Sequence, residues 1–114
     1  MKIGEIAALL DATCILGEDR KDEEVSYGFA SDLMSDVLTL TQEGILLITG
    51  LCNIQTIRTA EMANIQFILF ARNKQITKDM LALAEQEDMV LLQTRYSLFK
   101  TSGILYQAGL KSVY

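Results

Sequence analysis

Three short polar segments of the chain carry side chains that could bind an anion. Each combines hydroxyl or amide groups with a glycine or a cation. Together they supply these candidate ligand-binding residues: Thr49, Gly50, Asn53, Arg72, Lys74, Thr94, Tyr96 and Ser97. Cationic side chains pair with phosphate or carboxylate, and free N–H groups at helix starts favour the same groups. These residue types therefore favour recognition of a small anionic metabolite, a phosphorylated metabolite or a nucleotide.

A fourth polar segment, "ASDLMSD", adds Ser31 and Asp32 to the candidates. Ser and Asp side chains accept hydrogen bonds from the first N–H groups of a helix, so either residue is expected to cap a short helix over residues 32–40. Asp32 and Asp36 lie four residues apart and could also hold a divalent ion. Capping and solvation explain the pair better, and we expect no metal site.

The residue inventory excludes several kinds of catalytic site. The chain has no histidine, no CxxC and only two cysteines, Cys14 and Cys52. Structural zinc sites of the usual kind and His-dependent nucleophilic triads are therefore excluded. Neither GxxxxGK[ST] nor GxGxxG occurs. We expect no cofactor and no enzymatic activity, with a phosphotransfer enzyme as the remote alternative.

Cys52 lies just before an expected helix start, a position that favours a thiolate. A redox role for this residue is one interpretation. A small, partly buried structural side chain is the interpretation that we favour.

Charge and hydropathy narrow the choice of partners. A net charge of −5 argues against nucleic acid, which requires clustered cations. No apolar run approaches the roughly 20 residues of a membrane span, and the N-terminus lacks a signal-peptide pattern. We therefore expect a cytoplasmic protein that binds neither nucleic acid nor membrane. The acidic segment Glu18–Glu24 is most simply a solvated loop, with a docking element as the alternative.

The second half of the chain is built from strand-turn-helix repeats. Three apolar runs, "GILLIT", "QFILFA" and "MVLLQT", place Ile45, Phe67 and Val90 at spacings of 22 and 23 residues. Apolar strands that alternate with helices indicate a parallel sheet covered on both faces. The helices that follow these strands are expected to be capped by Asn53, Thr77 and Ser97, and Gly109 to end the last one. In such sheets ligands bind beyond the carboxyl ends of the strands, where the polar segments lie.

The first half has a different pattern. An apolar stripe at helical spacing predicts a helix over residues 3–10. Residues 13–17 and 24–31 are each expected to form a strand, and the two could pair as a hairpin-like arm with the acidic loop at its tip. No proline or Ser/Gly linker interrupts the chain, so residues 1–114 are expected to form a single domain.

Several longer stretches resemble the DRTGG-domain family, in particular its small stand-alone bacterial members. The most specific are "ASDLMSDV", "GILLITG", "IRTAEMA" and "YSLF", and the likeness runs from the first helix to Gly109. The resemblance implies a three-layer α/β/α sandwich with a small, mostly parallel sheet, similar to the N-terminal domain of HPr kinase/phosphorylase. Family members accompany phosphotransacetylases and CBS-containing pyrophosphatases, which implies a regulatory or assembly role without catalysis.

The motif that names the family is missing from this chain. The turns where Asp-Arg-Thr and Gly-Gly are expected contain "GLCN" and "ARNK" instead. A ligand of that motif cannot be carried over to Thr49, Asn53 or Arg72, which stay candidates by their position at strand ends.

Two functions from different classes follow. The first is a non-catalytic regulatory or adaptor domain, a homodimer that senses a small anionic metabolite or nucleotide. The alternative is a ligand-free interaction partner of a larger metabolic or redox enzyme. Four apolar residues outside the repeats could form a self-complementary interface or close the core: Met34, Leu38, Val113 and Tyr114.

Overall fold

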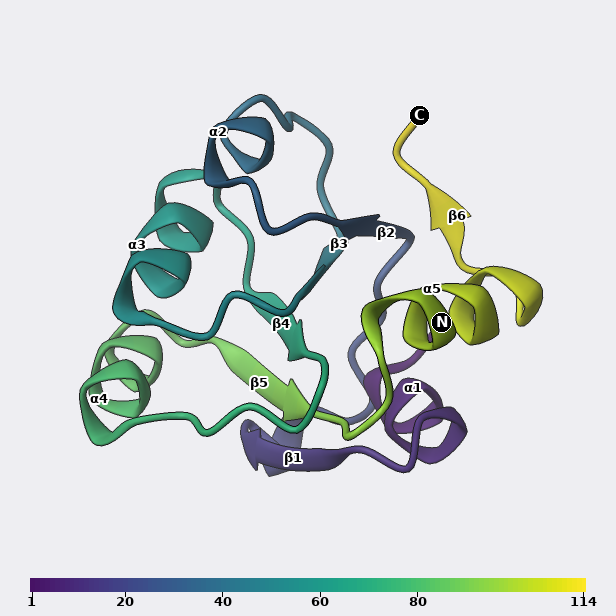
Figure 1. Ribbon diagram of the computed structural model, residues 1–114, viewed down its shortest axis with the longest axis horizontal. Helices are drawn as coiled ribbons and strands as arrows, with labels where there is room; N and C mark the ends of the chain where they lie inside the picture. Colours follow the sequence, from purple (N-terminus) through teal and green to yellow (C-terminus); the bar gives the residue numbers. More distant parts are fainter.

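The three apolar runs form adjacent parallel strands at the centre of a six-stranded sheet (Figure 1). This computed structural model describes residues 1–114. The central strands are β3 (Ile45–Thr49), β4 (Phe67–Phe70) and β5 (Val90–Gln93). Every residue of β3 and β4 is buried, because helices cover both faces of the sheet. The predicted mostly parallel α/β architecture is confirmed.

Three further strands extend the sheet in the order β1-β5-β4-β3-β2-β6. They are β1 (Thr13–Leu16), β2 (Tyr27–Ala30) and β6 (Lys111–Ser112). β1 pairs with β5 antiparallel, whereas β2 is parallel to both β3 and β6. The expected hairpin of β1 and β2 is wrong, since the central strands separate them. A two-stranded arm is marginal in water, and each strand buries more apolar surface by adding to the sheet.

Five α-helices cover the sheet in two layers (Figure 1). α1 (Ile3–Leu9) and α5 (Leu98–Gln107) lie on one face; α2 (Met34–Val37), α3 (Ile54–Met62) and α4 (Lys78–Gln86) lie on the other. Alternate strand residues therefore enter different cores: Leu46 and Ile48 face α1 and α5, while Ile45 and Leu47 face the other layer. No helix has the length and apolar character that crossing a membrane would require.

The predicted caps of the three long helices are confirmed. The side chains of Asn53, Thr77 and Ser97 accept hydrogen bonds from the N–H groups of Thr56, Met80 and Lys100 at 3.1–3.3 Å. Gly109 follows α5 with φ +108°, and the Leu110 N–H then donates to the Leu105 carbonyl at 3.0 Å. Local sequence therefore determines where these helices begin and where the last one ends.

The predicted cap of α2 is wrong. The helix spans only Met34–Val37, and its N-cap residue is Leu33, which makes no side-chain capping bond. Ser31 Oγ accepts from the Leu33 N–H at 3.0 Å in a local turn. Asp32 is not available as a cap, because its carboxylate is bound to the neighbouring strand end.

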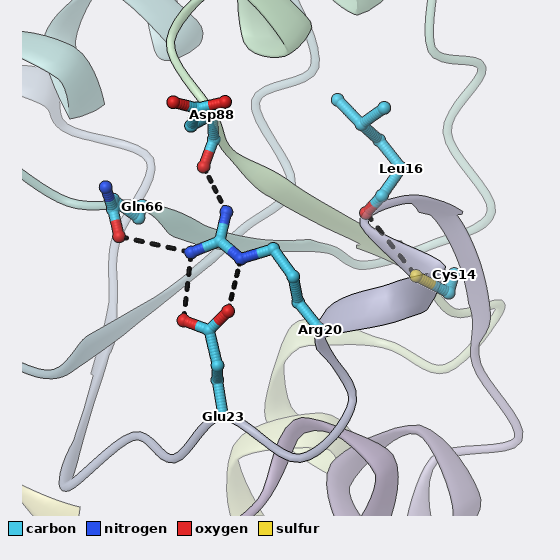
Figure 2. A network of polar contacts seen from close by, with 6 residues as sticks. All are labelled: Cys14, Leu16, Arg20, Glu23, Gln66 and Asp88. Carbon is cyan, nitrogen blue, oxygen red and sulfur yellow. Dashed lines mark hydrogen bonds and ion pairs between the residues drawn. The ribbon is translucent and has the colours of Figure 1, made fainter.

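A hydrogen-bond network around Arg20 anchors the connection between β1 and β2 (Figure 2). Arg20 ends the short 3₁₀ helix η1 (Glu18–Arg20). Its guanidinium binds both carboxylate oxygens of Glu23, at 2.5 and 3.0 Å, and also donates to Gln66 and to the Asp88 carbonyl. The acidic segment is therefore tied to the amino ends of β4 and β5.

Candidate functional site

The carboxyl ends of β2, β3, β4 and β5 bring the four polar segments to one edge of the sheet. These strands are parallel neighbours, so their ends are held together by ladder hydrogen bonds. The bonds continue into the turns: the Ala71 N–H donates to the Thr49 carbonyl at 2.9 Å and the Thr94 N–H donates to the Phe70 carbonyl at 3.0 Å. Ligands of parallel α/β sheets bind at this kind of edge.

Asp32 joins the end of β2 to the turn after β3. Its Oδ1 atom accepts hydrogen bonds from Thr49 Oγ1 at 2.9 Å and from the Gly50 N–H at 2.7 Å. Thr49 is fully buried, and its hydroxyl oxygen also accepts from the Leu51 N–H at 3.1 Å. Asp32 Oδ2 makes no hydrogen bond within the chain and lies 3.5 Å from the position that a Cβ atom would take on Gly50. One carboxylate oxygen is thus structural and the other is free.

Arg72 occupies an unusual backbone conformation at the end of β4. Arg72 and Asn73 have φ angles of +65° and +54°, in the left-handed region. Their N–H groups donate to the carbonyls of Tyr96 and Thr94 at 2.8 and 2.9 Å. These two bonds dock the turn after β4 on the turn after β5, and they offset the local cost of the conformation.

The guanidinium of Arg72 packs over Gly50. Its Nε and Nη2 atoms lie 3.2 Å from the position that a Cβ atom would take there. The side chain forms no hydrogen bond and no ion pair, including none with Asp32 on the same glycine. Gly50 is therefore flanked by a free carboxylate oxygen and a free guanidinium.

Other candidates have structural roles at the same edge. Asn53 and Ser97 use their side-chain oxygens as helix caps. Thr94 is buried, and its hydroxyl donates to the Leu10 carbonyl at 2.8 Å while it accepts from the Tyr96 N–H at 3.2 Å. Ser31 holds its own turn, and the Lys74 carbonyl accepts from the Gln93 side chain. Among the candidates, Asp32, Thr49 and Arg72 are brought together around Gly50.

Lys100 is a cation at this edge that the sequence analysis missed. Its Nζ atom lies 4.0 Å from the centre of the Tyr96 ring, the geometry of a cation–π contact. The spacing of the two residues, four apart across the start of α5, is the signal that could have identified the pair. The Tyr96 ring is partly buried against the core on the α1 and α5 side.

The main cavities of the molecule do not include the Gly50 region. Five cavities of about 220–470 Å³ have no lining contribution from Asp32, Gly50 or Arg72. The most apolar one, about 290 Å³, lies between β2, α5 and β6 and is bordered by Phe29 and Tyr114. Asp32 and Arg72 are both exposed beside the buried Gly50, so their polar groups form an open surface site, and the apolar cavity is a separate feature.

The thiol of Cys52 favours its protonated form, although its place before α3 suggests a thiolate. Burial raises the pKa of its thiol above the ordinary value of 9.0, and nearby Lys74 only partly offsets this effect on the pKa. The thiol donates to the Gln75 carbonyl at 3.4 Å. The expectation that this position favours a thiolate is wrong, because desolvation outweighs the local positive charge.

Comparisons with known proteins add a family and a fold. A family model described as "DRTGG domain" matches residues 5–108. The solved CBS and DRTGG domains of the regulatory region of Clostridium perfringens pyrophosphatase, complexed with the activator diadenosine tetraphosphate, are similar with a TM-score of 0.74 and 15% identity. The match covers 94% of this chain and 46% of that one, so this chain spans about half its length. No curated protein matches the sequence.

Proposed function

Because the chain belongs to the DRTGG domain family, we propose that it is a non-catalytic regulatory domain that works as a homodimer. Its input is a small anionic metabolite or nucleotide that binds at the carboxyl edge of the sheet. The similar pyrophosphatase region is regulatory and was solved with a nucleotide activator, which supports including nucleotides among the ligands. Binding there would be read out through the partner copy or a larger enzyme.

The observation that carries this proposal is the unpaired guanidinium of Arg72 over Gly50. An arginine in a protein of net charge −5 has many carboxylates available as partners. Arg20 and Arg95 each form an ion pair, whereas Arg58 and Arg72 form none. Of these two, Arg58 lies within α3 and Arg72 follows β4 at the carboxyl edge of the sheet. A guanidinium with free donors at the ligand-binding edge of a parallel sheet is suited to phosphate or carboxylate.

The backbone at Arg72 supports the same proposal. A left-handed conformation is uncommon for residues other than glycine and is associated with functional sites. The bonds to the Tyr96 and Thr94 carbonyls hold the turn in place without using the guanidinium. The fold thus holds the backbone of Arg72, while the donors of its guanidinium have no partner within the chain.

A thermal-shift screen with adenine nucleotides, acyl phosphates and sugar phosphates tests this function. A ligand at 100 times its dissociation constant adds about 2.7 kcal/mol to the free energy of unfolding, which gives a clear rise in melting temperature. We expect at least one such ligand and expect Arg72→Ala to abolish the rise. Arg58→Ala is the matched control, because Arg58 is an exposed arginine on α3 that forms no ion pair.

A screen without any anion-dependent rise would contradict the sensing function. So would a rise that Arg72→Ala leaves unchanged, because the ligand would then bind elsewhere. In either case the ligand-free interaction partner becomes the better explanation. Its support is the apolar cavity bordered by Phe29 and Tyr114, together with the exposed side chains of Leu33 and Leu38 at the two ends of α2.

A further inference from the structure

The two carboxylate oxygens of Asp32 are in different situations. Oδ1 accepts from Thr49 Oγ1 and from the Gly50 N–H, at 2.9 and 2.7 Å, so both donors of the β3 turn are satisfied. Oδ2 has no donor within the chain and lies 3.5 Å from the position that a Cβ atom would take on Gly50. An ionised carboxylate oxygen only accepts hydrogen bonds, so Oδ2 is suited to a group that carries an O–H or N–H.

Arg72 provides the complementary chemistry on the same glycine. Nε and Nη2 are two donors on one edge of a planar guanidinium, and both lie 3.2 Å from the Cβ position of Gly50. Two such donors suit the two oxygens of a phosphate in a bidentate arrangement. A bare phosphate would satisfy Arg72 but would meet Asp32 Oδ2 as a like charge.

From this arrangement we infer that the site selects a phosphate ester with a free hydroxyl close to the phosphate. The phosphate binds Arg72, and the hydroxyl donates to Asp32 Oδ2. This inference rests on the proposed function and narrows its ligand to a class. The class covers free sugar phosphates and the ribose phosphate of a nucleotide, which share the same pair of groups. In other parallel sheets an acidic residue at a strand end binds a ribose hydroxyl by the same chemistry.

Glycerol 3-phosphate and n-propyl phosphate form a matched pair of probes, since they differ only in hydroxyl groups. Titration calorimetry on the full chain should show that glycerol 3-phosphate binds about tenfold more tightly, the effect of one hydrogen bond to a charged acceptor. This comparison uses the unaltered protein and does not depend on the folding of any variant. Ribose 5-phosphate and AMP, measured alongside, distinguish the two sources: tighter binding of AMP indicates a nucleotide, and tighter or equal binding of ribose 5-phosphate indicates a free sugar phosphate.

Two variants assign the preference to named atoms. In Asp32→Asn the remaining oxygen can still accept from Thr49 and Gly50, while an NH2 group, which only donates, replaces Oδ2. The variant should therefore bind glycerol 3-phosphate and n-propyl phosphate about equally, and its affinity for n-propyl phosphate should be retained. Gly50→Ala places a methyl group between Oδ2 and the guanidinium and should weaken both probes. That methyl would lie 3.2 Å from the end of the long Arg72 side chain, which can shift, and at an ordinary contact distance of 3.5 Å from Asp32 Oδ2, so the variant provides a test even where Asp32→Asn fails to fold.

The outcomes separate this inference from the proposed function. Equal binding of the two probes, lost in Arg72→Ala, would overturn the hydroxyl preference and leave anion sensing intact. A preference that persists in folded Asp32→Asn, or binding unchanged in Gly50→Ala, would overturn the assignment to these atoms. If neither probe binds and the nucleotides and acyl phosphates of the screen also fail, the proposed function falls together with the inference.

Discussion

The buried threonines of this chain differ in whether their hydroxyls have partners. Thr49, Thr56 and Thr94 each donate to an oxygen at 2.6–2.9 Å. Thr101 is fully buried on α5, and its Oγ1 atom makes no hydrogen bond. A buried hydroxyl without a partner costs free energy relative to an apolar group of the same shape.

Replacing Thr101 with valine tests whether its unpartnered hydroxyl destabilises the fold. Thr101→Val should raise the free energy of unfolding by about 1 kcal/mol, because it removes an unsatisfied hydroxyl without opening a cavity. Urea unfolding followed by circular dichroism measures the change. Thr94→Val is the control and should lower it by about 1–2 kcal/mol, since Thr94 loses bonds to Leu10 and Tyr96. Destabilisation by Thr101→Val would show that this hydroxyl has a partner in solution.

At the scale of the elements, the connection between β1 and β2 is held in place by an ion pair between Arg20 and Glu23. Arg20 is partly buried beneath the amino ends of β4 and β5, and its guanidinium also lies 5.5 Å from the centre of the Phe67 ring. The hydrogen bond from Arg20 holds the pKa of Glu23 below the ordinary value of 4.5. A carboxylate whose pKa is lower in the folded state than in the unfolded state stabilises the fold at pH values above its unfolded pKa. This contribution is lost as the pH falls through the folded pKa.

The pH dependence of stability should therefore distinguish two glutamates of the same loop. At pH 7, Glu23→Gln is expected to lower the free energy of unfolding by up to about 1 kcal/mol, because the ion pair is half exposed. At pH 3 the difference from the unaltered chain should shrink toward zero. Glu24→Gln, an exposed residue without an ion pair, should change little at either pH. Thermal melts at both values measure this, and a Glu23→Gln effect independent of pH would exclude the ion pair as its cause.

At the scale of the whole molecule, the apolar surface is uneven. The Tyr114 side chain is 86% exposed and packs edge-on against Phe29, with 6.2 Å between ring centres. Beside this pair is the cavity of about 290 Å³ between β2, α5 and β6. Of the four residues that could form an interface or close the core, Leu38 and Tyr114 are exposed, whereas Met34 and Val113 pack partly against the core.

The proposed homodimer can be tested through Tyr114. Light scattering after size exclusion should give twice the chain mass of 12.7 kDa. Tyr114→Ser should shift the population toward the monomer, because it removes an aromatic anchor from the surface beside the cavity. Phe99→Ser is the control, since Phe99 is 89% exposed and does not line this cavity. A monomer at all concentrations would contradict the dimer, and an unchanged dimer in Tyr114→Ser would place the interface elsewhere.

Local sequence determined the central strands, the three helix caps and the glycine that ends α5. Apolar runs specify strands that are buried on both faces, and capping side chains bond within three residues of their own position. The same reasoning placed Thr49, Gly50 and Arg72 at strand ends, where they are found. These features depend on neighbours along the chain, which is why the sequence alone predicts them.

Only the tertiary structure decided how the edge is assembled. Whether β2 pairs with β1 or with β3 depends on the apolar surface that each arrangement buries, and no local pattern expresses this difference. Once β2 lies beside β3, Asp32 reaches the Gly50 N–H, 18 positions later in the sequence, and no longer caps α2. The free carboxylate oxygen and the free guanidinium on either side of Gly50 come from separate strand ends. Their juxtaposition is a property of strand order, which long-range packing determines.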